Sequence, residues 1–335
     1  MKDNRSGIKL DARVIPFPRS VSPEAQTVLR RLVGEDGVPS NSLHTMPAED
    51  DLEGWRAIKK AVEQHYDTMA KAIKPTLLSA ATTLTIGLTT VHVATPANPG
   101  ETDGVLIDLH GGAFVFGGGE ACRVGAQKQA DQYNIQCYGV DYRMPPDYPY
   151  PFALDDCMAT YRYVLERHAA AKIIICGRSA GGNLAVATLL RARDEGLPFP
   201  AGLVLLSPEV DLTESGDSFE INQMVDVVLP ISLMECNRLY AAGADLSHPH
   251  LSPLFGKLDS FPPTLLQSGT RDLFLSNTVR MHRALRAAGV AADLHVFEAM
   301  PHGGFMGGTP EDLEIVEEVK AFIRQHLSFN NVPSL

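Results

Sequence analysis

Ser179 is the residue of this sequence whose setting best suits nucleophilic chemistry. It is the centre of the pentapeptide Gly-Arg-Ser-Ala-Gly at 177–181, which directly follows the apolar run at 172–176. The pattern predicts a strand that turns sharply into a helix with the serine at the apex. A serine hydroxyl is a weak nucleophile unless it is held rigidly beside a base. The glycines permit the tight turn, and the helix directs its first N–H groups at the reacting oxygen.

A carboxylate and a histidine follow two later strand-like runs. Asp272 comes after the run 264–267, and His302 comes after the run 294–297. Ligands of open α/β sheets bind at the carboxyl ends of the strands, so we expect both side chains to lie near Ser179. The order serine, acid, histidine along the chain is the one that α/β-hydrolases use.

Other residues compete for these roles or suggest a metal. Asp293 and Glu298 are alternative acids, and Glu298 is too close in sequence to His302 to be the first choice. His248 and His250 have a spacing that suggests metal binding, but no third ligand follows nearby. A metal site is therefore not expected at this pair.

Several motifs together resemble those of the hormone-sensitive-lipase-like carboxylesterases of the α/β-hydrolase superfamily. They are His-Gly-Gly at 110–112, Asp-Tyr-Arg-Met-Pro-Pro at 141–146, Gly-Arg-Ser-Ala-Gly-Gly-Asn at 177–183, Arg-Asp-Leu-Phe-Leu-Ser at 271–276 and Pro-His-Gly at 301–303. The resemblance covers roughly residues 83–327. It implies an α/β-hydrolase fold with a mostly parallel central sheet, helices on both faces and a helical cap.

The resemblance implies a serine carboxylesterase that works through an acyl-enzyme and needs no cofactor or metal. Ser179 is expected to attack the acyl carbon, and His302 to act as general base and then general acid. Asp272 is expected to fix the tautomer of the imidazole and to stabilise the imidazolium. The expected substrates are esters of short or medium acyl chains.

The His-Gly-Gly motif is expected to help hold the oxyanion of the tetrahedral intermediate. By resemblance, the donors are the backbone N–H groups of Gly111, Gly112 and Ala180. Losing one such donor typically costs about 3 kcal/mol of transition-state stabilisation. His110 is expected to hydrogen-bond within this loop and hold it in place, and not to act as a base.

Arg178 departs from the family, in which the residue before the nucleophile is acidic or small and polar. We expect its side chain to point away from the catalytic face, with a nearby carboxylate offsetting its charge. The alternative is that Arg178 alters the charge near the site, which leaves substrate preference open.

The elements that must position these residues alternate along the chain. Short β-rich runs alternate with helical patterns, which predicts a mainly parallel sheet covered on both faces. An early pair of runs predicts antiparallel strands at one edge, with a turn at 98–100 before the next strand. The predicted strands are 84–88, 91–93, 105–109, 135–140, 172–176, 203–206, 264–267 and 294–297, and the predicted helices are 153–168, 180–193, 278–288 and 312–327.

Two stretches, 1–80 and 208–255, show helical patterns and no convincing strand, and they match the cap of the family. The expected organisation is therefore cap at 1–80, hydrolase core at 81–207, cap at 208–255 and core at 256–335. Cap helices are predicted near 24–32, 52–74 and 231–242. The candidate linings of the acyl and alcohol sites are Trp55, Met69, Leu77, Met224, Val228 and Leu233.

Composition excludes several other classes of protein. The 335 residues are 44% apolar and 21% charged, as in a globular domain, and the net charge of −11 does not suit nucleic acid. No secretory leader is visible at the N-terminus, and no apolar stretch approaches the roughly 18 residues of a membrane span. The five cysteines include no C-x-x-C pair, and a reducing cytoplasm fits best. A homodimer is possible, since relatives are monomers or dimers.

The same machinery could also open lactones or deacetylate a natural product, because acyl-enzyme chemistry does not distinguish these substrates. A non-catalytic ligand-binding protein of the same fold is a further alternative. The presence of His302 counts against it, because receptors of this fold have lost the catalytic histidine.

Overall fold

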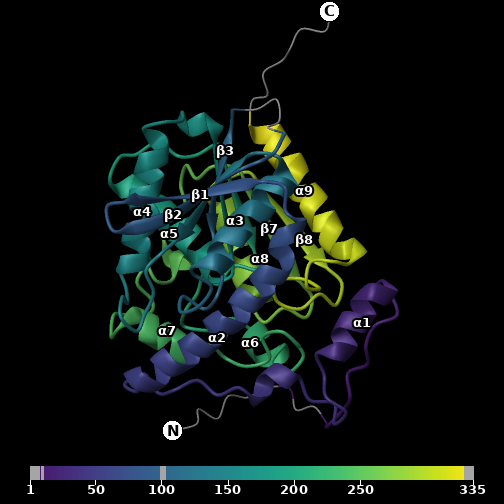
Figure 1. The fold of residues 1–335 in the computed structure, drawn as a ribbon. Coiled ribbons are helices and arrows are strands. Elements are labelled where there is room, and N and C mark those ends of the chain that lie inside the picture. Colours follow the sequence, from purple (N-terminus) through teal and green to yellow (C-terminus); the bar gives the residue numbers. More distant parts are fainter. Residues whose placement is uncertain (1–7, 9–10, 99–102, 328–335) are drawn as a thin grey trace, which may run out of the picture.

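The computed structural model of the chain describes residue 8 and residues 11–98 and 103–327 (Figure 1). The predicted turn at 98–100 lies partly outside these residues, as do the chain ends. The strands are β1 (Ala80–Ile86), β2 (Thr89–Thr95), β3 (Val105–Leu109), β4 (Gln136–Asp141), β5 (Ile173–Arg178), β6 (Gly202–Leu206), β7 (Thr264–Gly269) and β8 (Ala292–Phe297). The α-helices are α1 (Pro23–Arg31), α2 (Leu52–Ile73), α3 (Glu120–Tyr133), α4 (Phe152–Leu165), α5 (Ala180–Asp194), α6 (Ser218–Ile221), α7 (Met234–Ala241), α8 (Leu275–Ala287) and α9 (Pro310–His326).

The strands form one sheet in the order β1-β2-β4-β3-β5-β6-β7-β8. β1, β2 and β4 pair antiparallel, and all pairs from β4 to β8 are parallel. The mainly parallel sheet and the antiparallel edge are both confirmed. The first strand begins four residues earlier than predicted, and it ends at Ile86 because the chain turns at Gly87 and Leu88. The carboxyl ends of β3, β5, β7 and β8 therefore lie along one edge of the sheet.

Helices cover both faces of the sheet, because the central strands are apolar on both sides. Ile107, Ile175 and Leu205 pack on one face in a core that α4, α5 and α8 complete. On the other face, Ile174 and Val204 pack in a core with α3, α9 and α1. This arrangement is the one expected of parallel strands joined by crossover helices.

Helix α3 is absent from the sequence prediction. Its buried residues are not confined to one stripe, since Val124 is buried on the side opposite Cys122, Ala126 and Ala130, and the polar Gln127 is buried as well. The connection between β3 and β4 could have revealed it, because adjacent parallel strands need a crossover of about a dozen residues or more, usually helical. Helix α8 also begins at Leu275, three residues before the predicted start at Thr278.

A helical layer made of α2, α6 and α7 lies over the loops that follow β3 and β7 (Figure 1). Trp55 of α2, Phe219 of α6 and Leu239 of α7 pack in one cluster with Phe116 and Phe274 from those two loops. Both loops leave carboxyl ends of parallel strands. The layer therefore covers the edge of the sheet at which the predicted site residues lie.

The other helix of the predicted cap segment 1–80 packs elsewhere. Leu29 of α1 is buried in the core that includes α9. At the start of α1, Ser22 donates its N–H and its hydroxyl to the carboxylate of Glu311, at 2.7 and 2.8 Å. The N-terminal segment is thus anchored on α9 before α2 crosses to the helical layer.

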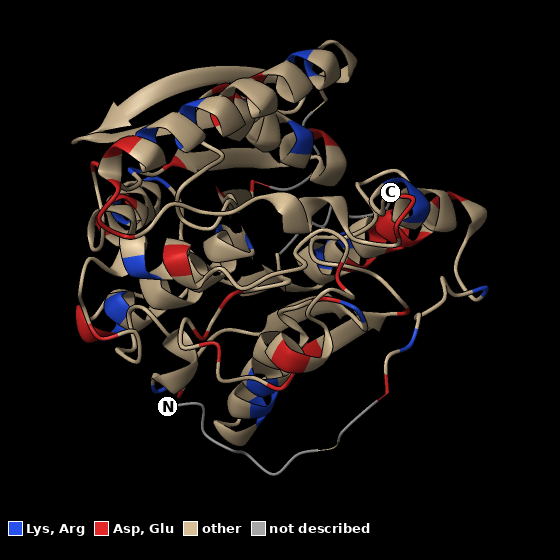
Figure 2. Ribbon diagram, turned by 90° about the horizontal axis from the view of Figure 1, so that it is seen from below, with Lys and Arg blue, Asp and Glu red and all other residues tan. Residues whose placement is uncertain are grey.

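Acidic and basic residues are interspersed on the side of the molecule seen in Figure 2. Figure 2, which views the molecule from below, shows red and blue positions interspersed along the helices. The chain therefore carries its net charge of −11 without gathering one sign on this side. None of the helices in the described residues combines the length and the apolar character needed to cross a bilayer.

Candidate active site

Ser179 occupies a strained turn between β5 and α5. Its backbone has φ 54° and ψ −122°, a combination that non-glycine residues rarely adopt. The N–H of Ser179 donates to the carbonyl of Leu206 at 3.0 Å, which ties the turn to the end of β6. The side chain is held at the end of the central strand and is buried, with 7% of the residue exposed.

Close backbone packing explains the glycines on either side of the serine. A Cβ on Gly177 would lie 2.2 Å from the carbonyl oxygen of Gly181, and one on Gly181 would lie 1.9 Å from the carbonyl oxygen of Leu109. Real Cβ atoms do not approach backbone so closely. The pentapeptide motif is thus required by the packing of the turn against β3 as well as by its curvature.

Ser179, His302 and Asp272 form a continuous hydrogen-bonded series. His302 Nε2 lies 2.9 Å from Ser179 Oγ, and His302 Nδ1 lies 3.0 Å from Asp272 Oδ1. A carboxylate only accepts, so Nδ1 carries the proton and Nε2 is free to accept the serine proton. The structure brings together all three residues predicted from strand ends, while Asp293 and Glu298 are exposed.

Asp272 is fixed by further donors. The N–H of Phe274 donates to Oδ1 at 2.8 Å, and Ser268 Oγ donates to Oδ2 at 2.7 Å. Burial alone would raise the pKa of Asp272, but the charge and hydrogen bond of His302 and the other donors lower it overall. The carboxylate therefore stays ionised opposite the imidazole.

The environment of His302 favours the imidazolium. Burial disfavours the charged ring, but Asp272 and then Asp226 outweigh it, so the pKa of His302 is raised above 6.5. The ring of Phe274 meets the imidazole edge-on with centroids 4.8 Å apart. A base of this kind can take up a proton from a serine and hold it during the reaction.

Gly111 lies beside the serine, and Gly112 is packed within the same loop. A Cβ on Gly111 would be 3.2 Å from Ser179 Cβ, and Gly112 has φ +125° with its Cβ position 2.1 Å from the carbonyl oxygen of Phe116. Ala180 is the first residue of α5, where N–H groups have no acceptor within the helix. Gly111 and Ala180 thus adjoin Ser179, and Gly112 follows Gly111 in the same tightly packed loop.

His110 lies against the same loop. Its Nδ1–H donates to the carbonyl of Gly111 at 2.8 Å, and its ring stacks on Tyr142 with centroids 4.1 Å apart. The Tyr142 hydroxyl donates to the carbonyl of His110 at 2.8 Å. Burial lowers the pKa of His110, so the ring is neutral and suits a supporting contact.

Comparison with known proteins identifies the fold and the relatives of the chain. A family model described as the α/β-hydrolase fold matches residues 106–306. The chain is 32% identical to an acetyl-hydrolase of Streptomyces hygroscopicus over 246 residues, which is 72% of this chain and 81% of that protein. It is 34% identical to an esterase of Acinetobacter venetianus over 199 residues, 58% of this chain and 66% of that protein.

The crystal structure of an esterase called E25 has a TM-score of 0.89 at 35% identity and covers 96% of this chain and 99% of its own. That of an esterase from the bacterial hormone-sensitive lipase family has a TM-score of 0.79 at 29% identity, with 92% and 99% covered. The chain belongs to the hormone-sensitive-lipase-like esterases of the α/β-hydrolase family. It is a carboxylic ester hydrolase. Its fold is the one expected of that family.

Arg178 of the esterase points to the loop that carries His302. Its Nη1 donates to the carbonyl of Gly303 at 2.7 Å. The nearby carboxylate is Asp108, which burial gives a raised pKa of about 6, while hydrogen bonding by Gln129 and the charge of Arg178 act to lower it. Arg178 therefore bridges the nucleophile turn and the histidine loop.

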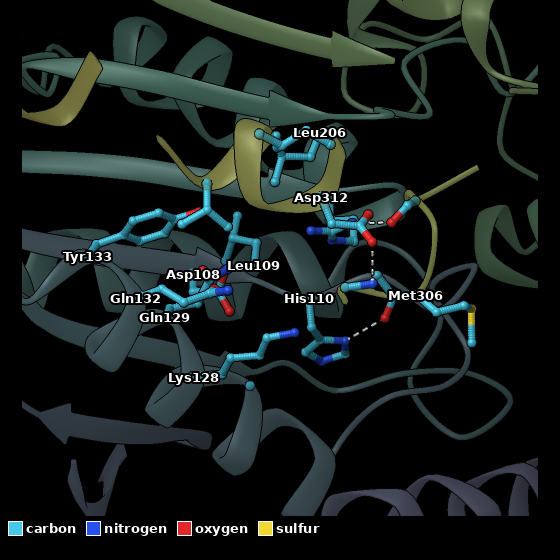
Figure 3. Close-up of a pocket in the computed structure, with 17 residues that line it drawn as sticks. Asp108, Leu109, His110, Lys128, Gln129, Gln132, Tyr133, Leu206, Met306 and Asp312 are labelled. Carbon is cyan, nitrogen blue, oxygen red and sulfur yellow. Dashed lines mark hydrogen bonds between the residues drawn. The ribbon is translucent and has the colours of Figure 1, made fainter. Parts of the chain in front are cut away.

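Behind this bridge the esterase has a cavity of about 280 Å³ (Figure 3). Asp108, Lys128 and Arg178 line it, together with Asp312 from α9. Burial and the charge of Arg178 lower the pKa of Lys128, which the nearby Asp312 partly offsets. Ser179 and His302 do not line this cavity, but Gly111 and Gly303 do, so the cavity adjoins the proposed reaction centre.

Within the described residues, one group offers metal-ligand atoms close together. The atoms of His110, Cys122 and Asp141 lie within 4.8 Å of one another. Asp141 already accepts the N–H of Gly119 at 3.1 Å, and burial keeps the pKa of Cys122 well above its usual value. A protonated thiol and an occupied carboxylate do not suit a metal.

The other histidine pair considered for a metal has a local role. The N–H of His250 donates to Nδ1 of His248 at 3.1 Å, and the two rings meet edge to face. This contact uses one of the ring nitrogens that a metal would need. The pair is therefore explained by the turn in which it lies.

The predicted lining residues lie in different parts of the structure. Trp55 and Leu233 are buried in the helical layer, next to Phe274. Met69 and Met224 are exposed, and Val228 packs against the core on the α3 and α9 face. The remaining candidate, the half-buried Leu77, follows the end of α2.

Sequence reasoning missed two polar residues of the segment between β6 and α7. Asn222 Nδ2 donates to the carbonyl of Asp272 at 2.8 Å. Asp226 Oδ2 accepts the N–H of His302 at 3.0 Å. Both lie in an irregular stretch without a motif, so nothing in the local sequence distinguishes them from ordinary turn residues.

Proposed function

We propose that the esterase hydrolyses esters of short or medium acyl chains through an acyl-enzyme on Ser179. The observation that carries this proposal is the hydrogen-bonded series from Ser179 through His302 to Asp272, at 2.9 and 3.0 Å. Its distances and its tautomer are those that a serine nucleophile requires.

In the first half of the reaction, Ser179 Oγ attacks the acyl carbon as its proton passes to His302 Nε2. The negative oxygen that forms is held by the N–H groups of Gly111, Gly112 and Ala180. His302 then gives the proton to the departing alcohol. In the second half, water attacks the acyl carbon, His302 takes the proton of the water, and Ser179 leaves with that proton.

Two observations support a short acyl chain. The helical layer over the strand ends is filled with large side chains, among them Trp55, Phe219 and Phe274. One relative is named an acetyl-hydrolase. The same similarity favours a second candidate function, removal of an acetyl group from a larger molecule, which would use the same residues.

We also propose that the segments 1–80 and 208–255 act as the cap, with 81–207 and 256–335 as the hydrolase core. The support is the packing of α2, α6 and α7 over the loops that carry the site residues. A cytoplasmic location is proposed because all five cysteines lie in the described residues as buried free thiols. Light scattering would measure whether two copies form the proposed homodimer.

The test is hydrolysis of p-nitrophenyl esters from acetate to palmitate by the wild type and by Ser179→Ala. We expect turnover that is greatest for the short chains and falls at least about a thousandfold in the variant. Labelling by a fluorophosphonate probe should disappear in Ser179→Ala. Full activity in that variant would refute the proposal, and absence of labelling in the wild type would favour the ligand-binding alternative.

A further inference from the structure

Asp226 is a buried carboxylate that the proposed reaction does not use. It lies between α6 and α7, in the segment that crosses from β6 to the helical layer, and is 0% exposed. Its Oδ1 accepts the N–H groups of Val228 and Leu229 at 2.9 and 3.0 Å. These two bonds form a local turn of a kind that aspartate commonly stabilises.

The second oxygen of Asp226 has a different set of partners. Oδ2 accepts the N–H of Leu273 at 2.8 Å and the N–H of His302 at 3.0 Å. Leu273 directly follows Asp272 on the loop after β7, and His302 lies on the loop after β8. One oxygen atom therefore joins the main chains of the two loops that carry the proposed acid and base.

The position also has an electrostatic consequence. The titratable groups that face Asp226 are Asp272 and His302, one from each loop. Burial and then the charge of Asp272 raise the pKa of Asp226 to about 7, against the pull of His302 and the backbone donors. When ionised, Asp226 is a second negative charge that supports the His302 imidazolium.

We propose that Asp226 is a positioning residue of the esterase, which holds the acid and histidine loops in register and adds negative charge near the imidazole. This inference rests on the proposed roles of Ser179, Asp272 and His302. It makes the proposed cap segment a structural part of the reaction centre, because the contact comes from the chain between α6 and α7. Movement of this segment would move His302 relative to Ser179.

The test is Asp226→Asn, assayed with p-nitrophenyl butyrate from about pH 5 to about pH 9. The asparagine amide has one oxygen that accepts and one NH₂ group that only donates. Whichever way it is turned, the NH₂ group faces N–H donors, either those of Leu273 and His302 or those of the local turn. We expect kcat to fall at least about tenfold with KM changed less than about twofold. The acid limb of the pH profile should move to lower pH, because the imidazolium loses a supporting charge.

Asp211→Asn is the matched control. Asp211 is also 0% exposed and lies in the same segment, but its carboxylate binds Thr213, Ser215 and Arg280 rather than the catalytic loops. We expect this variant to lower the melting temperature and to leave the acid limb in place. A purely structural role for Asp226 would give the same result in both variants, and would overturn the inference.

Asp226→Glu keeps the charge and provides a conservative rescue. Its acid limb should stay near that of the wild type even if kcat falls. This result would distinguish the effect of the negative charge on His302 from the positioning of the two loops. If Asp226→Asn does not fold, Asp226→Glu is compared with the neutral variant Asp272→Asn. The inference would be contradicted if the acid limb of the pH profile moved as far in Asp226→Glu as in Asp272→Asn. Fluorophosphonate labelling distinguishes failure of the proposed reaction from failure of the role proposed for Asp226. If the wild type is not labelled, the proposed reaction itself is refuted.

Discussion

Arg178 Nη1 lies 2.7 Å from the carbonyl oxygen of Gly303, so the residue before the proposed nucleophile is bonded to the residue after the proposed base. Asp226 accepts the N–H of His302, the residue before Gly303. The histidine loop is therefore held by a cation at one carbonyl and by an anion at one N–H. The two residues also act on the imidazole with opposite charge.

Replacing Arg178 by methionine should move the acid limb of kcat/KM to higher pH. Arg178 acts to lower the pKa of His302, so its removal leaves the imidazolium more stable. The shift is opposite in sign to the one expected for Asp226→Asn. A pH profile of both variants beside the wild type checks this, and shifts in the same direction would contradict the electrostatic account.

The wild type should lose activity as the pH falls through the pKa of His302, because only the neutral imidazole accepts the serine proton. That pKa is raised above 6.5, so the acid limb should lie above pH 6.5 as well.

Asp272→Asn should lower kcat by up to about ten thousandfold, because the wrong tautomer of His302 is then favoured. Its remaining acid limb should lie at lower pH, and an unchanged limb would argue against Asp272 as the acid.

Gly181→Ala should destabilise the esterase severely. Its new Cβ would lie 1.9 Å from the carbonyl oxygen of Leu109, so β3 and α5 would have to separate, at a cost of about 3 kcal/mol or more. Gly196→Ala is the control, since Gly196 has φ +71° with no atom within 4 Å of the added Cβ. That variant should lose about 1 kcal/mol. Urea unfolding measures both, and equal losses would refute the packing argument.

Trp55→Ala tests the helical layer. The side chain is 0% exposed and its Nε1–H donates to the carbonyl of Ala48 at 2.9 Å, so truncation should cost about 3 to 5 kcal/mol. If the layer limits the acyl chain, the preferred ester should also become longer. Met69→Ala on the same helix, at an exposed position, should change stability by less than about 0.5 kcal/mol. An ester series that does not shift would count against the layer as the chain-length limit.

The sequence was most informative where residues follow strands. Ser179, Asp272 and His302 could each be predicted, because parallel strands bring their carboxyl ends to one edge, and three such ends carried chemically matched side chains. The glycines at 177 and 181 could also be predicted, because they belong to a recognisable motif. Their identity is dictated by backbone packing that any chain with this turn must satisfy.

Other features depend on contacts between distant and irregular segments. The bond from Asp226 to His302 spans 76 residues, and the bond from Arg178 to Gly303 spans 125. Neither contact has a signal in the local sequence, because what matters is where each loop runs in space. Helix α3 was missed for another reason, since it is buried on several sides and its apolar residues show no single stripe.

The hydrogen bond between Ser179 and His302 closes a loop of 123 residues. Its geometry requires β5, β6, β7 and β8 to be paired in register, because each strand fixes the start of one loop at the site. Hydrolysis therefore reports completed folding. We expect ester hydrolysis to appear later during refolding than helix formation or chain collapse. A refolding experiment followed by turnover would time the assembly of the last parallel strand.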